Sequence, residues 1–108
     1  MKRRQVIIEL PALQDIAEAF SWLAQHEATA EKWFDSIYDT MASLEYFPER
    51  CSMAPESESF KFEIREIFHG RRQHKYRILF TVSADEVHVL HVRHGARQAL
   101  GESESESD

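Results

Sequence analysis

Three histidines and two arginines lie within the stretch VHVLHVRHGARQ, residues 87–98. A zinc site needs three or four ligands that converge at ~2.0–2.3 Å. The valines favour a strand, in which His88 and His91 face opposite sides, as do His91 and His94. His88 and His94 share a face but would lie ~20 Å apart at ~3.3 Å per residue. We therefore expect no metal ion and no cofactor, and an ordinary surface position for His88.

Cations are concentrated in the second half of the chain. Residues 60–100 hold 8 Lys/Arg against 4 Asp/Glu, whereas residues 1–59 hold 5 against 11. Arg93, His94 and Arg97 lie where the last predicted strand ends, a common place for functional groups. The planar fork of a guanidinium suits phosphate or carboxylate. Two interpretations stay open: a patch that binds an anion, and arginines that only solvate a polar face.

The spacing of apolar residues predicts the elements that position these side chains. A β-branched run predicts a first strand, two stripes at helical spacing predict a helical hairpin, and three alternating runs predict three further strands. We expect an α+β fold in the order β-α-α-β-β-β, with the two helices packed on one face of a mainly antiparallel four-stranded sheet. The predicted ranges are strands 4–10, 60–68, 75–83 and 86–93, helices 11–24 and 30–44, and a loop over 48–59.

Alternation along the strands predicts which side chains meet the helices. Phe60, Phe62 and Ile64 share one face of their predicted strand, and Ile78 and Phe80 share one face of the next. The other face of the sheet would be uncovered, and the cations that follow the opposite parity would point from it. The predicted binding surface there consists of Lys61, Arg65, Arg77, Arg93 and Arg97.

Length and composition set further expectations. A chain of 108 residues with 43% hydrophobic residues suits one folded domain, which we place at residues 1–100. A single cysteine suits a reducing compartment, and we expect a cytoplasmic protein. No apolar run reaches the ~18 residues of a membrane span, and Glu9 and Asp15 interrupt any signal-peptide core.

The last eight residues, GESESESD, alternate acidic and small polar residues. Such a segment cannot repay the entropy of folding, so we expect residues 101–108 to be disordered. The simpler hypothesis is a solvated extension that aids solubility. The alternative is that its four carboxylates, tethered beyond Arg93 and Arg97, compete with an anionic ligand for the basic face.

The segment KYRILFTVSADEVHVLHVRHGARQ, together with EIREIFHG and a helical hairpin ending in LEYFPER, resembles the RelE/ParE toxin superfamily. The resemblance extends over about residues 4–98. It implies the toxin of a type II toxin–antitoxin pair, a plasmid-stabilization type of module in which a cognate antitoxin wraps the toxin and holds it inactive. ParE-like members block DNA gyrase. RelE-like members resemble metal-free endoribonucleases that cut mRNA on the ribosome.

The resemblance implies candidate catalytic residues only for the RelE-like alternative. Arg77 matches the strand arginine of that family, Arg97 the arginine after the final glycine, and Arg65 falls near its lysine pair. No tyrosine follows HGARQAL, and His94 would have to serve as acid or base. Because this catalytic set is incomplete, we expect inhibition through gyrase. The alternatives are the mRNA endoribonuclease and a non-toxic module that only binds the antitoxin.

Overall fold

The computed structural model describes residues 2–26, 29–70 and 75–94. The order of elements is β-α-α-β-β-β, as predicted, and three short 3₁₀ helices follow the second α-helix. The helices are α1 (Leu10–His26), α2 (Ala30–Ala42), η1 (Ser43–Glu45), η2 (Pro48–Arg50) and η3 (Pro55–Ser59). The strands are β1 (Gln5–Ile8), β2 (Arg65–His69), β3 (Tyr76–Val82) and β4 (Glu86–His94).

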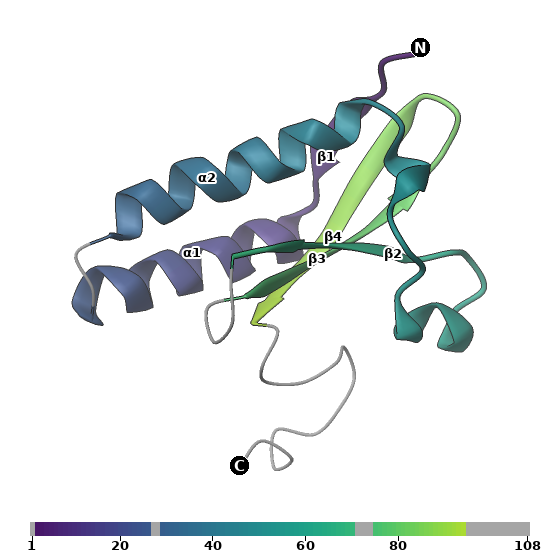
Figure 1. The fold of residues 1–108 in the computed structure, drawn as a ribbon. Coiled ribbons are helices and arrows are strands. Elements are labelled where there is room, and N and C mark those ends of the chain that lie inside the picture. The colour runs from purple at the N-terminus through teal and green to yellow at the C-terminus, as the bar shows by residue number, and fades with distance from the viewer. Residues whose placement is uncertain (1, 27–28, 71–74, 95–108) are drawn as a thin grey trace.

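The four strands form one sheet in the order β1-β4-β3-β2. β4 is antiparallel to β3, β3 is antiparallel to β2, and β1 is parallel to β4, so the sheet is mixed. The α1–α2 hairpin lies along one face of this sheet (Figure 1). The α+β layer predicted from the sequence is confirmed. Within the described residues, no helix is both long enough and apolar enough to cross a membrane.

Each helix buries one stripe. Ile16 and Leu23 of α1 and Ile37 and Met41 of α2 lie at helical spacing and are all buried. Ile16, Ile37 and Met41 pack on the inward residues of β3 and β4, among which Phe80 has no exposed surface. Because a large apolar side chain gains ~1.5–3 kcal/mol from full burial, this shared core holds the hairpin on the sheet.

Strand β2 begins five residues later than predicted. Its side chains also point to the opposite side of the sheet from the side predicted. Phe60 and Phe62 precede the strand and are 45% and 53% exposed, so the prediction that they meet the helices is wrong. Arg65 lies opposite Phe80 in the sheet. Directly opposed residues share a face, so a shift of one residue moves every side chain to the other side.

The face of the sheet away from the helices is not uncovered, which corrects a second prediction. We call residues 48–64, which include η2 and η3, the covering segment. Ala54 and Ile64 of this segment pack with Leu79 of β3 in a second buried cluster. Ala54 N donates to Ile64 O, and Glu66 N donates to Ser52 O, so the segment also pairs with itself and with the edge of β2. Part of the predicted binding face is therefore interior.

A bulge in β4 changes which side chains share a face. Leu79 lies opposite His91 and Phe80 lies opposite Val89, so Leu90 is the extra residue on β4. An extra residue reverses the parity of every position beyond it. Val92 consequently continues the buried face begun by Val89. The prediction that His88 and His94 share a face, which assumed a regular strand, is wrong.

Candidate functional site

Arg77 is buried in an ion-pair cluster on the face away from the helices. Its Nη1 and Nη2 donate to the two carboxylate oxygens of Glu56, at 2.9 and 2.7 Å. Nε and Nη2 also donate to Oε1 of Glu66, at 3.1 and 2.9 Å. The hydrogen bond to Glu56 is the main cause of a raised Arg77 pKa. With 8% of its surface exposed, Arg77 is a structural ion in this conformation and does not offer its fork to a ligand.

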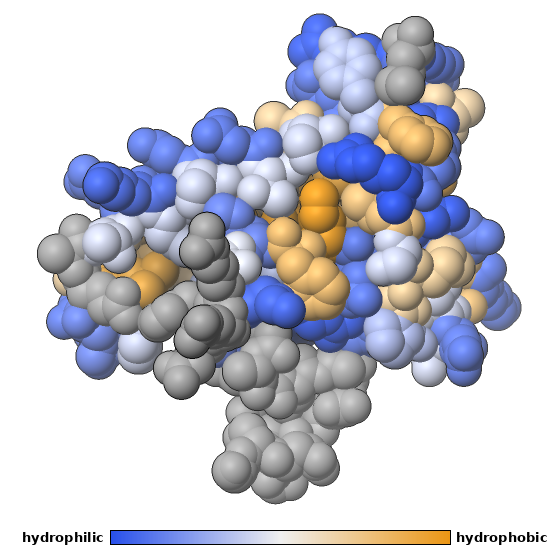
Figure 2. Space-filling view, in the orientation of Figure 1, coloured by the Kyte–Doolittle hydropathy of each residue, from blue (hydrophilic) through white to orange (hydrophobic). Residues whose placement is uncertain are grey.

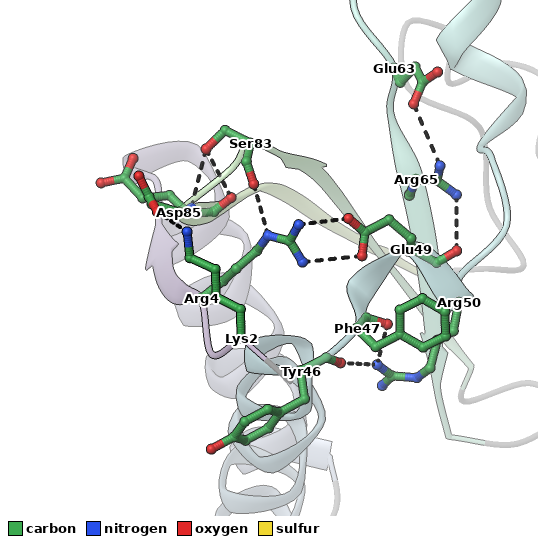
Figure 3. A network of polar contacts seen from close by, with 11 residues as sticks. Lys2, Arg4, Tyr46, Phe47, Glu49, Arg50, Glu63, Arg65, Ser83 and Asp85 are labelled. Atoms are coloured by element: carbon green, nitrogen blue, oxygen red, sulfur yellow. Dashed lines mark hydrogen bonds and ion pairs between the residues drawn. The ribbon is translucent and has the colours of Figure 1, made fainter.

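Arg65 lies on the other side of the sheet from Arg77. It is directly opposite Phe80, whereas Arg77 is opposite Phe68, and adjacent positions on β2 alternate in direction. Nη1 of Arg65 donates to Cys51 O at 2.7 Å, and its Nη2 lies 3.6 Å from Glu63 (Figure 3). The guanidinium fastens the covering segment to the start of β2. The sequence prediction of one surface that contains both arginines is wrong.

Among the predicted cations that lie in the described residues, only Arg93 is placed beside Arg77. The two residues are directly opposite each other on β4 and β3. His94, by contrast, is opposite the buried Tyr76, and the two rings meet edge to face at 5.1 Å. Lys61 is exposed and lies in the covering segment, outside the sheet. Arg97 lies outside the described residues, so its predicted place in the patch stays a prediction.

His88 and His91 both contact carboxylates. His88 Nδ1 lies 2.5 Å from Glu9 and its Nε2 lies 2.8 Å from Glu86. Carboxylates only accept, so both ring nitrogens donate in the charged form. These contacts, led by the one to Glu9, raise the His88 pKa. His91 Nδ1 lies 3.0 Å from Oδ2 of Asp15.

Asp15 also closes the edge of β4. Its Oδ2 accepts from Val92 N at 2.9 Å, at a level of the sheet that β1 does not reach because β1 ends opposite Val89. Within the described chain, no group of three His, Cys, Asp or Glu side chains is arranged to hold a metal ion. His88 and His91 therefore connect β4 to Glu9, which precedes α1, and to Asp15 of α1.

His69 is a residue that sequence reasoning missed. Its Nε2 lies 2.9 Å from Ser36 Oγ and its Nδ1 lies 2.9 Å from Thr40 Oγ1. Burial lowers the His69 pKa. The two hydroxyls are four residues apart on α2, on one side of the helix, which is the only sequence feature that could have pointed to this bridge.

A polar network joins the start of the chain to the covering segment. Arg4 makes a two-pronged contact with Glu49, at 3.2 and 2.8 Å, and its Nε donates to Ser83 O (Figure 3). A hollow of about 350 Å³ beside β1 is lined by Arg3, Arg4, Gln5, Val6 and Glu45. Because its cations already face carboxylates, we see no arrangement of acid, base and nucleophile there.

Ten large apolar side chains of the described residues are exposed. Phe47, which is 52% exposed, has φ 46° and ψ 57°, a left-handed conformation that is unfavourable for a bulky residue. Arg50 Nη1 holds this turn by donating to Tyr46 O and Phe47 O (Figure 3). Apolar surface gathers near the middle of the view in Figure 2 and toward its right side. The exposed large apolar residues are Leu10, Leu13, Trp22, Phe34, Tyr46, Phe47, Met53, Phe60, Phe62 and Phe68.

The chain was compared with known families, curated proteins and solved structures. No curated protein matches it. A solved structure titled "Chromosomal ParDE TA system from P. aeruginosa" is similar in fold, with a TM-score of 0.68 and 14% sequence identity over 85% of this chain and 96% of that one. The family described as the ParE toxin of the type II toxin–antitoxin system, parDE, matches residues 6–99. This chain therefore belongs to the ParE toxin family of type II toxin–antitoxin systems.

Proposed function

We propose that this protein inhibits growth by binding DNA gyrase and is neutralised by an antitoxin encoded beside it. Family membership makes it the toxin of a two-protein system. Gyrase is the target that the ParE branch of the superfamily implies. The observation that carries the choice of target is the state of Arg77, whose guanidinium is buried against Glu56 and Glu66.

A metal-free ribonuclease needs a base, an acid and cations that converge on one phosphate. The candidate residues for such a site do not converge in the described structure. Arg65 and Arg77 lie on opposite faces, and His94 packs against Tyr76 on the helix side. This separation favours a toxin that acts through a binding surface over one that cuts RNA.

Exposed aromatic side chains support a protein-binding role. Aromatic residues and arginine are enriched at the energetic centres of protein interfaces. Tyr46 and Phe47 are about half exposed and are held in place by Arg50. Phe60 and Phe62 stack with centroids 5.9 Å apart on the covering segment. We place the partner surfaces across the helical hairpin and the sheet face beside the covering segment.

The test is expression without the antitoxin, followed by measurement of gyrase-dependent DNA breaks and ribosomal mRNA cuts in the same cells. We expect DNA breaks with intact transcripts. Arg77→Ala is unsuitable as the diagnostic variant because it would leave Glu56 and Glu66 buried without their cation. The better pair is Arg97→Ala with Lys61→Ala as its control.

Three outcomes would contradict the proposal. Codon-phased mRNA cuts that vanish in Arg97→Ala and persist in Lys61→Ala would establish the endoribonuclease. Unaffected growth with retained antitoxin binding would establish a non-toxic binding module. The absence of a small partner gene beside this one would remove the two-protein system itself.

A further inference from the structure

Arg93 belongs to a row of three side chains that crosses the sheet. Phe68 of β2 is opposite Arg77 of β3, which is opposite Arg93 of β4. Directly opposed side chains point from the same face, here the face away from the helices. The row therefore places an exposed ring, a buried cation and a second cation side by side, with strands ~4.8 Å apart.

Arg93 has no hydrogen-bond acceptor in the described part of the chain, although its Nε is buried. The carboxylates of Glu56 and Glu66 lie close to this row, but their oxygens are held by Arg77, which donates four hydrogen bonds to them. A buried donor without an acceptor is unfavourable in a folded protein, because the lost hydrogen bond to water is not replaced. Within the described residues, Arg93 thus lacks an acceptor, whereas the guanidinium of Arg77 beside it is paired with Glu56 and Glu66.

The surroundings of Arg93 indicate which kind of ligand group could accept its hydrogen bonds. Phe68 is 45% exposed, and Lys75 Nζ lies 4.9 Å from the centre of its ring. Leu90, on the same strand as Arg93, is partly buried against the second core cluster. Cationic nitrogens flanked by apolar surface suit a single carboxylate carried between apolar side chains.

A nucleic-acid backbone fits this place less well. Two carboxylates stand beside the row, and the whole chain carries a net charge of −6. A polyanion would meet repulsion from these carboxylates, whereas a single carboxylate can contact Arg93 without approaching them.

We propose that Arg93 is the anchoring residue for a side-chain carboxylate of the antitoxin, within a segment that lies across the Phe68–Arg77–Arg93 row. This inference rests on the proposed toxin–antitoxin function and deepens it. A purely structural role for Arg93 does not account for its buried Nε, because no acceptor in the described residues ties that nitrogen to the fold. The free protein should therefore tolerate the loss of the Arg93 charge.

The experiment measures binding of the protein encoded by the adjoining reading frame to the purified chain and to three variants. Arg93→Gln should weaken binding by about tenfold or more, mostly through faster dissociation. Arg93→Lys should recover part of the loss, since an ammonium keeps the charge but not the fork. Lys2→Gln, which removes a cation whose side chain is 60% exposed near the start of the chain, should change affinity by less than about twofold. The melting temperature of free Arg93→Gln should be unchanged or higher.

A double-mutant cycle identifies the carboxylate. Each Asp or Glu of the partner is changed to its amide, and one such change should cause little further loss when combined with Arg93→Gln. Failure to find any coupled carboxylate would overturn the inference.

Other outcomes separate the inference from the function on which it rests. Equal affinities of the wild type and Arg93→Gln would overturn the role of Arg93 and leave the toxin–antitoxin pair intact. No binding of the wild type would overturn both. A lower melting temperature for Arg93→Gln would overturn the inference in favour of a structural role. Loss of affinity for a single-stranded RNA oligonucleotide in that variant, with antitoxin affinity unchanged, would overturn it in favour of a nucleic-acid role.

Discussion

Two histidines of this toxin respond to pH in opposite directions because their surroundings differ. His88 lies between the carboxylates of Glu9 and Glu86, which raise its pKa. His69 is buried between two hydroxyls of α2, and burial lowers its pKa. Because one pKa is raised and the other is lowered, the effects of the two residues can be separated by measuring stability against pH.

For His88, the folded state binds the proton more tightly than the unfolded state. Its contribution to stability is therefore fully present below the unfolded pKa of ~6.5 and is lost as pH rises through the folded value. We expect His88→Gln to lower the free energy of unfolding by ~0.5–1 kcal/mol at pH 5.5 and by less at pH 8.5, since the pair is partly exposed. Urea unfolding at the two pH values checks this, and an equal loss at both would contradict it.

For His69, the folded state binds the proton less tightly. Stability therefore rises with pH between the lowered folded pKa and the unfolded value of ~6.5, and it falls as the solution is acidified through that range. His69→Gln keeps a group that can hydrogen-bond to Ser36 or Thr40 but does not titrate. The variant should show a weaker loss of melting temperature between pH 7 and pH 5 than the wild type. A steeper loss in the variant would show that His69 is not the group responsible.

Among the elements, the covering segment determines which side chains of the sheet are accessible to a partner. It crosses the face where the sequence predicted an open cationic surface, and Glu56 fixes it by pairing with Arg77. The side chains of Arg77 and Glu56 are only 9% and 4% exposed. Removing one partner of a buried pair leaves an uncompensated charge, which is strongly destabilising.

Glu56→Gln should lower the free energy of unfolding by about 2–4 kcal/mol, a loss moderated by the second carboxylate at Glu66. The control is Glu63→Gln, which breaks the pair with Arg65 at a side chain that is 72% exposed. This control should cost less than about 0.5 kcal/mol. Denaturant unfolding of both variants provides the comparison, and a similar loss in the two would mean that the Glu56 pair does not fix the segment.

The layers of the fold could be predicted from the sequence, because the stripes of α1 and α2 and the alternation of β3 are local patterns. The faces of β2 and β4 could not. Phe60 and Phe62 alternate like strand residues, yet the chain at that point is returning from η3 and has not reached the sheet. The bulge at Leu90 lies in the segment VHVLHV, where Val87 and Val89 alternate as they would in a regular strand. The late start of β2 and the bulge in β4 each reverse the face from which the following side chains point. Each therefore changed which residues we expected in the binding surface.

Glu56 shows a different limit of sequence reasoning. It stands 21 positions from Arg77 in a Ser-rich stretch, where an acidic residue is expected to be solvated. Its burial follows from how the covering segment crosses the sheet. A long-range pair of this kind has no periodic pattern in the sequence, so the predicted availability of Arg77 could be corrected only by the structure.

For the molecule as a whole, charge placement predicts an effect of the acidic C-terminal residues, which lie outside the described part of the chain. Truncation after Leu100 changes the net charge from −6 to −2. If the tail competes for Arg93, truncation should tighten antitoxin binding by less than about tenfold, most at low salt, because exposed pairs contribute ~0–1 kcal/mol each. The melting temperature should not change. Equal affinities of the two forms at low ionic strength would leave only a solubility role.

The central claim is that this ParE family member acts on gyrase through a binding surface and does not cut RNA. Its most direct test combines the purified protein, without antitoxin, with gyrase and plasmid DNA, and in parallel with ribosomes engaged on mRNA. We predict that double-stranded DNA breaks accumulate only when both gyrase and the protein are present, and that the mRNA stays intact. Cleavage of ribosome-bound mRNA with unchanged gyrase activity would contradict the claim.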